Sequence, residues 1–476
     1  MQIDMRVLVV EDDLEFVSDL VSAIGSAVKA EVVIAHSRDS ALERLSNEFF
    51  DLVVLDLKIP TTDGHLGAAT EHGLAVFTKA QQLAPGTPIC ILTGSPAETF
   101  IPDLLRRQHH VDIWGDGVKV GVVQFLKKWD FKEFPGLIQS MAQAVHRLAD
   151  VELSRTNEVD LSVAEDRLVR IFARRRSGVH CALTKLGGLS GSKVLRITVT
   201  GSDGGIRDRA VAKLGTLQEI EAEAELYDRH VTRLEPVATP RRLETIQFGA
   251  RDRAGVFYSL AEGYERSLFE LVREKDPIVP TALVGLAHVL TKWSDGVPWQ
   301  LKSITDVRRR LLSDKSAQLV ISTYGLDWAG DFEALSIYPR WCCTHGDLHG
   351  GNVLVNRSGA PALIDYGDIA DGPPALDPVT LELSAIFHPE GVFYSSEWPA
   401  IETAKKWGEL DAYLSGCPYP DFVGGCREWA LRVATGSREI AATAYSYLLR
   451  QLKYPDTNKD RALALIDGVR AYYEST

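Results

Sequence analysis

The chain has 476 residues, of which 45% are hydrophobic and 25% are charged, and its formal net charge is -13. This apolar content is enough for two or three buried cores, so we expect more than one domain. No run approaches the roughly 18 to 20 apolar residues that span a bilayer, and the start lacks the basic-then-apolar order of a secretory signal. We therefore expect a cytoplasmic protein with no membrane partner.

The acidic charge also disfavours binding to nucleic acid, because phosphate contacts need a basic surface. A local basic patch remains open at Arg174, Arg175 and Arg176. Apart from that patch, we expect no nucleic-acid partner.

Short apolar strands alternate with amphipathic helices in the first part of the chain. This order is typical of a parallel sheet with helices on both faces. The sequence therefore predicts an α/β domain with a doubly wound, five-stranded parallel sheet. The predicted strands lie at 6–10, 30–36, 52–57, 88–92 and about 122–126.

Carboxylates follow two of these strands directly. Glu11, Asp12 and Asp13 come after the first strand, and Asp56 lies at the end of the third. The carboxyl ends of parallel strands meet at one edge of the sheet, where ligands bind. Clustered carboxylates repel one another unless a cation is bound, and hard oxygen ligands suit Mg²⁺. With Mg²⁺ offsetting the charge, Asp56 could attack a phosphoryl donor.

The later strands bring a hydroxyl and an ammonium to the same edge, in the motifs ILTGS and FLKK. Together with VLVVEDD and VVLDLKIP, these motifs resemble the response-regulator receiver domain, which has the flavodoxin-like fold. The resemblance implies that Asp56 is the phosphoacceptor, that Glu11 and Asp12 bind the metal with it, and that a histidine kinase is the phosphodonor. It also implies that Thr93 is the switch hydroxyl and Lys128 the phosphate-binding lysine.

Two features depart from the receiver pattern. Trp129 stands where a proline usually follows the lysine, and segments 61–73 and 106–121 look longer than usual. Apolar residues at helical spacing over 137–151 predict a last helix that extends into a connector. This helix is also the predicted coupling element, either as a homodimer seam or as a clamp on the small lobe. The alternative is a last receiver helix that packs only on its own sheet.

A second group of polar residues has the spacing of a phosphoryl-transfer site. Asp347 lies five residues before Asn352, an apolar strand follows, and Asp365 closes the next strand in LIDYGD. One carboxylate must accept the proton of an attacking hydroxyl, while an amide and a second carboxylate hold the metal that neutralises the nucleotide phosphates. A loop and the following hairpin can bring these groups together.

The motif HGDLHGGN resembles the aminoglycoside and choline kinase branch of the protein-kinase-like superfamily. The resemblance implies a bilobal α+β domain that uses ATP and Mg²⁺. It also implies that Asp347 is the catalytic base, that Asn352 and Asp365 are Mg²⁺ ligands, and that His345 braces the loop.

Antiparallel strands at 181–186, 193–200 and 209–214 supply the small lobe that this resemblance requires. The loop between the first two is rich in small residues, which let backbone N–H groups approach phosphates. The predicted nucleotide-binding residues of this loop are Gly187, Gly188, Ser190, Gly191 and Ser192.

Lys213, on the third of these strands, matches the lysine that contacts nucleotide phosphates in the family. Glu223 is its predicted ion-pair partner on the next helix, and Glu221 is the alternative. The apolar strand 257–261 is the predicted hinge that contacts adenine.

We predict a receiver at 1–132, a helical connector at 133–165 and a kinase-like domain at 166–476, with a small lobe at about 170–262 and a large lobe at about 263–476. Few residues separate Asp365 from the next predicted helix, which leaves an open acidic cleft suited to a cationic or hydroxylated small molecule. The predicted function is phosphotransfer to a hydroxyl of a small molecule or protein, regulated by the receiver. The alternative is a non-catalytic nucleotide-binding scaffold that relays the receiver state to a protein partner.

Overall fold

A computed structural model describes residues 4–94, 110–156, 159–187, 192–236, 238–260 and 262–476. The chain divides into two compact units, Met1–Glu221 with Arg242–Ser259, and Ala222–Arg241 with Leu260–Thr476. The first unit therefore holds the predicted receiver together with the strands of the predicted small lobe. Within the described ranges, no helix is long and apolar enough to cross a membrane.

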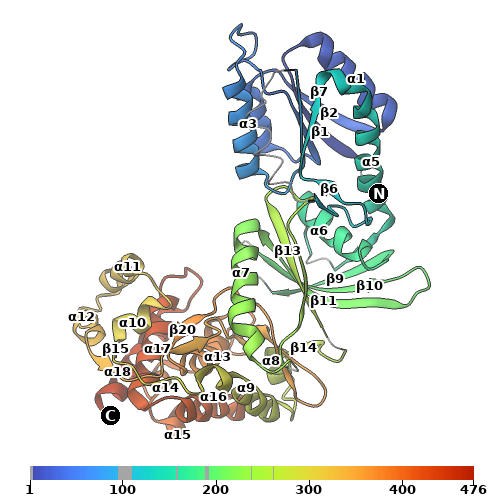
Figure 1. The fold of residues 1–476 in the computed structure, drawn as a ribbon. Coiled ribbons are helices and arrows are strands. Elements are labelled where there is room, and N and C mark those ends of the chain that lie inside the picture. Colours follow the sequence, from blue (N-terminus) through green and yellow to red (C-terminus); the bar gives the residue numbers. More distant parts are fainter. Residues whose placement is uncertain (1–3, 95–109, 157–158, 188–191, 237, 261) are drawn as a thin grey trace. The chain divides into compact units, whose positions relative to one another are not determined.

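The first unit begins with a five-stranded, all-parallel sheet in the order β2-β1-β3-β4-β7. This order confirms the predicted doubly wound fold (Figure 1). It makes β1 and β3 neighbours, so their carboxyl ends lie side by side. Its strands are β1 (Met5–Val10), β2 (Ala30–Ala35), β3 (Leu52–Leu55), β4 (Ile89–Thr93) and β7 (Val123–Lys127).

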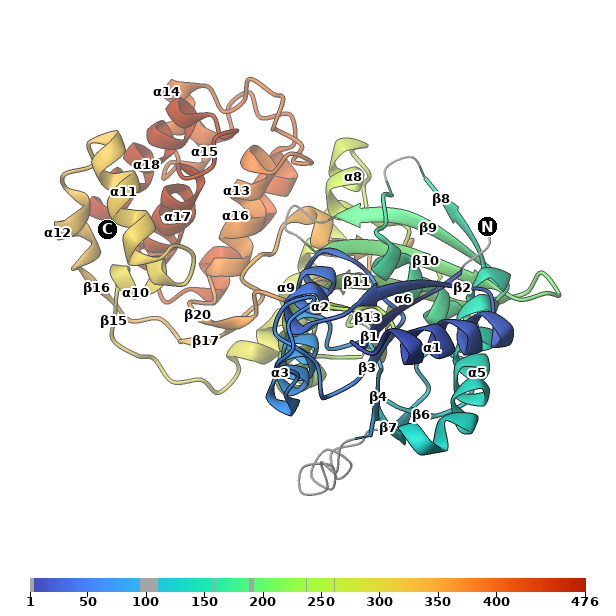
Figure 2. The same ribbon diagram turned by 90° about the horizontal axis from the view of Figure 1, so that it is seen from above.

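Helices cover both faces of this sheet (Figure 2). One buried cluster contains Leu20 of α1 and Ile138 of α5, and the opposite cluster contains Leu45 of α2 and Val76 of α3. Burial of these apolar stripes is what fixes the helices on the sheet. The helices are α1 (Leu14–Ala27), α2 (Arg38–Asn47), α3 (Thr70–Leu83) and α5 (Phe134–His146).

The connector is less helical than predicted. Helix α5 ends at His146, a 3-10 turn covers Arg147–Asp150, and Glu152–Arg155 forms strand β8. Strand β8 pairs in parallel with β9 (His180–Gly187), so it joins the next sheet as an edge strand. The apolar spacing of 137–151 extends beyond the end of α5 because the 3-10 turn that follows the helix also buries an apolar residue, Leu148.

The second sheet of the first unit has six strands in the order β12-β13-β11-β10-β9-β8. All its pairs except β8 with β9 are antiparallel, as predicted for the small lobe. The remaining strands are β10 (Lys193–Thr200), β11 (Ile206–Thr216), β12 (Arg242–Ile246) and β13 (Arg253–Ser259).

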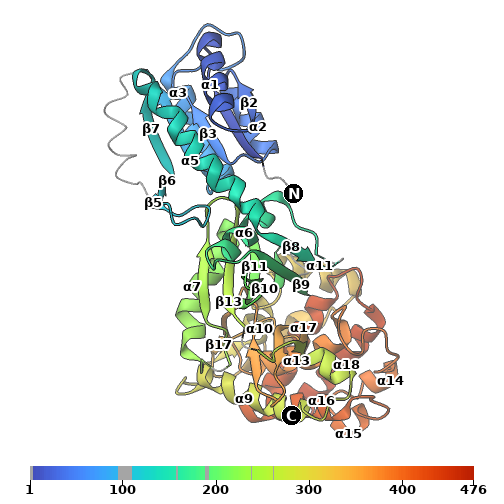
Figure 3. The same ribbon diagram turned by 90° about the vertical axis from the view of Figure 1, so that its right-hand side faces the viewer.

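Helix α6 (Val163–Arg174) joins the two sheets of the first unit into one core (Figure 3). A single buried cluster runs from Val9 and Met141 of the receiver to Phe172 of α6 and Phe257 of β13. The rings of Phe172 and Phe257 stack with their centroids 4.0 Å apart. The receiver and the small-lobe sheet therefore pack as parts of one hydrophobic core.

Polar contacts reinforce this junction at the edge of the receiver sheet away from the carboxylate cluster. Arg167 Nη2 of α6 lies 3.1 Å from Asp51, and both side chains are almost fully buried. The turn at Gly86 exchanges backbone hydrogen bonds with the turn between β12 and β13, from Gly86 N to Arg251 O at 2.7 Å and from Gly249 N to Gly86 O at 2.8 Å. A Cβ atom on Gly86 would lie 2.7 Å from the Arg251 carbonyl oxygen, so the close approach requires glycine.

The long receiver segment before β7 also contacts α6. Its described part forms the small hairpin β5 (His110–Val111) and β6 (Val120–Gly121). Arg174 donates to the carbonyls of Trp114 and Ala144, at 3.4 and 2.7 Å. This longer segment therefore contributes to the junction with the small-lobe sheet.

The three consecutive arginines at the end of α6 and just after it do not form a free basic patch. Arg175 pairs with Glu244 at 2.6 Å, and Arg176 pairs with Asp208 at 2.6 Å. With the carbonyl contacts of Arg174, all three guanidinium groups are engaged within the first unit.

The second unit is mainly helical, as the sequence predicts for the large lobe (Figure 1). Helix α7 (Leu217–His230) crosses into it from the first unit. The other helices are α8 (Leu268–Arg273), α9 (Val279–Ser294), α10 (Ile304–Arg309), α11 (Asp314–Tyr324), α12 (Ala329–Glu333), α13 (Leu376–Phe387), α14 (Ile401–Ala404), α15 (Leu410–Tyr413), α16 (Pro420–Val433), α17 (Ser437–Gln451) and α18 (Lys459–Glu474). Short strands interrupt them at β14 (Arg266–Ser267), β15 (Lys302–Ser303), β16 (Ser336–Ile337), β17 (Cys342–Thr344), β18 (Val353–Val355), β19 (Pro361–Leu363) and β20 (Ala370–Gly372).

Candidate functional site

Three carboxylates gather at the carboxyl edge of the receiver sheet. One oxygen each from Glu11, Asp12 and Asp56 lies within 4.8 Å of the others. The parallel register of β1 and β3 produces this cluster, because it pairs Val10 with Leu55 and so aligns the residues that follow them. Asp13, by contrast, is the cap of α1 and accepts hydrogen bonds from the backbone of that helix.

Lys128 forms ion pairs with two residues of the carboxylate cluster. Its Nζ lies 2.7 Å from Asp56 Oδ2 and 2.7 Å from Glu11 Oε2. Burial and the neighbouring Asp56 charge raise the pKa of Glu11 to about 7, which reflects the cost of holding these carboxylates together without a further cation. The donor set is all oxygen and its charge is only partly neutralised, so the residues fit a Mg²⁺ ion.

Thr93 and Trp129 are the other two residues that the sequence singles out at this edge of the sheet. Thr93 ends β4 opposite Lys127, but its side chain lies outside the described part of the structure. Trp129, which replaces the usual proline, is 66% exposed, and the Lys127 ammonium lies 4.8 Å from its ring centroid.

The second unit brings the predicted catalytic residues together around the hairpin of β18 and β19. Asn352 Nδ2 donates to the backbone oxygen of Asp347 at 3.0 Å. The backbone N–H of Ile364 donates to Asn352 O at 3.0 Å, which places the neighbouring Asp365 beside the same end of the hairpin. Asp365 has a left-handed φ of 65°, a backbone conformation that a β-strand residue does not adopt. The chain therefore turns out of the strand at this carboxylate.

His345 and Asp377 hold the loop that carries Asp347. His345 is fully buried, and its Nε2 donates to Ile364 O at 3.1 Å. Asp377, at the start of α13, accepts the backbone N–H groups of His345 and Gly346 at 3.0 and 3.1 Å. The bracing role of His345 stays a prediction, and these hydrogen bonds show that Asp377 also holds the loop. The sequence predicts a helix near Asp377 but gives no sign of this contact.

Sequence reasoning missed Arg450, which lies on α17. Its Nη2 is 3.2 Å from Asp347 Oδ1. Burial alone would raise the pKa of Asp347, but the charges of His349 and Arg450 outweigh it and lower that pKa. No local pattern marks Arg450, because it lies in an ordinary amphipathic helix far along the chain.

A pair of stacked histidines lies beside this loop. The rings of His349 and His388 have centroids 4.2 Å apart. Burial, followed by the neighbouring His349, lowers the pKa of His388 to about 3, so it is neutral near pH 7.

The predicted nucleotide-binding residues of the small lobe are only partly described. Gly188, Ser190 and Gly191 lie outside the described residues, and Gly187 ends β9. Ser192 is buried, and its hydroxyl donates to Glu219 at 3.3 Å.

Lys213 lies on β11 between Val194 of β10 and Val256 of β13. It belongs to the first unit, whereas the buried Glu223 belongs to the second, so their ion pair stays a prediction. Glu221, the alternative partner, accepts a hydrogen bond from Gln247 at 3.1 Å.

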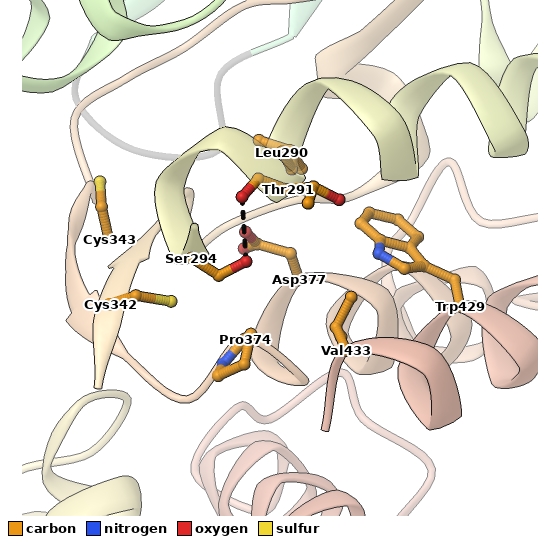
Figure 4. A pocket seen from close by; sticks show the side chains of 9 residues that line it. All are labelled: Leu290, Thr291, Ser294, Cys342, Cys343, Pro374, Asp377, Trp429 and Val433. Carbon is orange, nitrogen blue, oxygen red and sulfur yellow. Dashed lines mark hydrogen bonds between the residues drawn. The ribbon is translucent and has the colours of Figure 1, made fainter. Parts of the chain in front are cut away.

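A small pocket lies on the other side of Asp377 (Figure 4). Besides that carboxylate, it is lined by apolar side chains and by Thr291, Ser294, Cys342 and Cys343. Burial raises the pKa of the Cys342 thiol to about 12, so the thiol is a poor nucleophile near pH 7.

Comparison with known families finds two different domains along the chain. Residues 7–110 match the response regulator receiver domain, and residues 184–397 match the phosphotransferase enzyme family. The chain therefore joins a receiver domain to a kinase-like domain of the phosphotransferase family.

Solved structures similar to this chain include representatives of both domains. A CheY-like receiver domain from Methanospirillum hungatei is 21% identical, with 30% of this chain and 96% of that chain covered and a TM-score of 0.22. A receiver domain of a sensor histidine kinase from Pseudomonas aeruginosa, described with a magnesium ion in its active-site cleft, is 15% identical over 29% of this chain and 98% of that chain, with a TM-score of 0.22. An aminoglycoside-3'-phosphotransferase of type VIII is 18% identical over 62% of this chain and all of that chain (100%), with a TM-score of 0.37. No curated protein matches the chain.

Proposed function

We propose that this chain is a response regulator whose kinase-like domain transfers the γ-phosphoryl group of ATP to a hydroxyl of a small molecule or protein. The observation that carries the proposal is the arrangement around Asp347. Its backbone is held by Asn352 and its side chain is 32% exposed. Asp377 fixes the loop before Asp347 by accepting two of the loop's backbone N–H groups. A rigid loop that presents one accessible carboxylate suits a catalytic base.

In the proposed reaction, the acceptor hydroxyl oxygen forms a bond to the γ-phosphorus as the bond from that phosphorus to the β,γ-bridging oxygen breaks. The hydroxyl proton passes to Asp347, and ADP leaves with the bridging oxygen. Asn352 and Asp365 would hold Mg²⁺, which neutralises phosphate charge when bound. Lys213 would contact the nucleotide phosphates, with Glu223 as its partner.

We further propose that phosphorylation of Asp56 regulates this domain. A phosphohistidine of a sensor kinase would lose its N–P bond as an Asp56 oxygen gains the phosphoryl group. Lys128, now paired with both Asp56 and Glu11, would contact the added phosphate. The shared core between the receiver and the sheet that carries Lys213 supports regulation through the first unit. Because the two are packed together, a change at the receiver has a physical route by which to bias that sheet.

The test is turnover of Mg-ATP by the full chain with a panel of hydroxyl acceptors. Asp347→Asn should lower transfer by about two to four orders of magnitude while Mg-ATP binding changes little, because the residue accepts a proton and does not hold the nucleotide. Asp365→Asn should weaken Mg-ATP binding as well. Equal transfer by the wild type and Asp347→Asn would contradict the proposal and favour the non-catalytic scaffold.

A further inference from the structure

We propose that Arg450 selects an acceptor that carries a carboxylate or phosphate group near the hydroxyl to be phosphorylated. This inference rests on the proposed phosphotransfer at Asp347. Of the cationic or hydroxylated ligand that the acidic cleft predicts, it keeps the hydroxyl and proposes an anionic group beside it.

The position of Arg450 fixes a positive charge at the proposed base. Its guanidinium lies in the last turn of α17, with Nη2 3.2 Å from Asp347 Oδ1. Both side chains keep some solvent access, at 22% for Arg450 and 32% for Asp347. A ligand that reaches the Asp347 carboxylate therefore also reaches the guanidinium.

The guanidinium has more donors than the protein satisfies. Within the described ranges, Asp347 is the one side chain that accepts a hydrogen bond from Arg450, and the buried Nε of Arg450 has no acceptor. The protein thus uses few of the guanidinium donors, and a ligand that supplies an acceptor to the solvent-accessible ones gains by binding there. Carboxylate and phosphate groups match the planar fork of arginine with two parallel hydrogen bonds.

The charge of Arg450 is permanent. Although burial favours the neutral form, the neighbouring Asp347 carboxylate raises the pKa of Arg450 above its usual value. The guanidinium therefore cancels the charge of Asp347, and an ammonium group placed there would face a like charge. An anionic group beside the reacting hydroxyl would instead attract the guanidinium and leave Asp347 free for the hydroxyl proton.

In this scheme Arg450 is a positioning residue. It contacts the anionic group of the acceptor, while the bonds change as proposed above between the hydroxyl oxygen, the γ-phosphorus and the bridging oxygen. Loss of Arg450 should therefore weaken the apparent affinity for an anionic acceptor more than it slows turnover at saturation.

The experiment uses the full chain with Mg-ATP and two series of acceptors that differ in charge on one carbon skeleton. One series is glycerate, glycerol and 3-amino-1,2-propanediol, and the other is glucuronate, glucose and glucosamine. Phosphorylated products are identified by mass spectrometry, and kcat and KM are measured for each acceptor. The wild type should prefer the acid in at least one series.

The variants are Arg450→Gln, Arg450→Lys and the control Arg438→Gln, which alters an exposed arginine on the same helix. Arg450→Gln should raise KM for the acid by about tenfold or more and leave KM for the neutral acceptor nearly unchanged. Arg450→Lys should recover part of the loss, and Arg438→Gln should behave as the wild type.

Preference for a neutral or aminated acceptor would overturn the inference. An equal effect of Arg450→Gln on all acceptors would do the same, as would absence of transfer to both acids by a protein that hydrolyses Mg-ATP. Absence of any turnover, with water or with an added acceptor, would instead count against the proposed phosphotransfer itself.

Discussion

Asp51 of the receiver and Arg167 of α6 form an ion pair, 3.1 Å long, with side chains 1% and 5% exposed. The two residues are separated by 116 positions in the sequence. Asp51 also accepts the backbone N–H of Arg6 at 2.9 Å, so the pair connects the start of the receiver sheet to the helix that carries the small-lobe sheet.

Removing one partner of this pair should destabilise the first unit strongly. Arg167→Met leaves Asp51 buried without its counter-charge, and we expect the free energy of unfolding to fall by about 3–5 kcal/mol. The double variant Asp51→Leu with Arg167→Met should recover part of this loss, as urea unfolding would measure. Arg44→Met, which breaks the half-exposed pair with Glu48, is the control and should cost less than about 1 kcal/mol. A loss for Arg167→Met as small as that of the control would contradict the buried role.

The turn at Gly86 tests whether the junction transmits the receiver state. A side chain at Gly86 must displace the carbonyls of Arg251 and Gln247, whereas a Cβ on Gly136 of α5 meets nothing within 4 Å. Beryllofluoride should change Mg-ATP turnover of the wild type by a few-fold to hundredfold, for coupling of about 1–3 kcal/mol. Gly86→Val should reduce that ratio and Gly136→Ala should keep it. Thermal unfolding would confirm that both variants fold, and an unchanged ratio in folded Gly86→Val would exclude this route.

Acetyl phosphate with Mg²⁺ should label Asp56. The product should be stable in acid and labile to hydroxylamine, as an acyl phosphate is. Asp56→Asn should abolish the label, whereas Asp13→Asn should keep it because Asp13 is a helix cap outside the cluster. Label that persists in Asp56→Asn would show that another residue is the acceptor.

Saturating Mg-ATP should raise the melting temperature of the chain, because a ligand that binds only the folded state adds stability of about 2.7 kcal/mol at a hundred times its Kd. Lys213→Ala should weaken this effect. Lys185→Ala, an exposed lysine on the neighbouring part of the same sheet, should not. An equal shift in all three proteins would argue against contact between Lys213 and the nucleotide.

The stacked histidines should make stability depend on pH. Burial lowers the pKa of His388 from 6.5 to about 3 in the folded chain. Between these values the unfolded chain binds a proton that the folded chain does not, so stability is lost as pH falls below about 6.5. His388→Phe keeps the stacking and removes the proton, and its melting temperature should fall less over this range. The control His288→Gln changes an exposed histidine, and parallel curves for His388→Phe and the wild type would contradict the assignment.

Local sequence determined most of the receiver fold and both motif clusters. The strands before Glu11 and Asp56 are short apolar runs that end at carboxylates, and parallel pairing then requires those carboxylates to meet. Similarly, Asp347, Asn352 and Asp365 lie in one loop and the hairpin that follows it, so their spacing in the sequence is enough to predict that they come together. In each case the residues are close in sequence or are aligned by a repeated strand. The pattern of apolar and polar residues is therefore enough to predict that they meet.

Tertiary structure alone decided the contacts between residues that no local pattern links. The sequence does not predict strand β8, because Glu152–Arg155 is a short edge strand that depends on its pairing with β9. The approach of Arg450 to Asp347 and of Arg167 to Asp51 depends on how α17 and α6 pack, and packing is set by the whole core. The sequence therefore determined which groups can carry phosphoryl chemistry, and the folded chain decided which charges stand beside them.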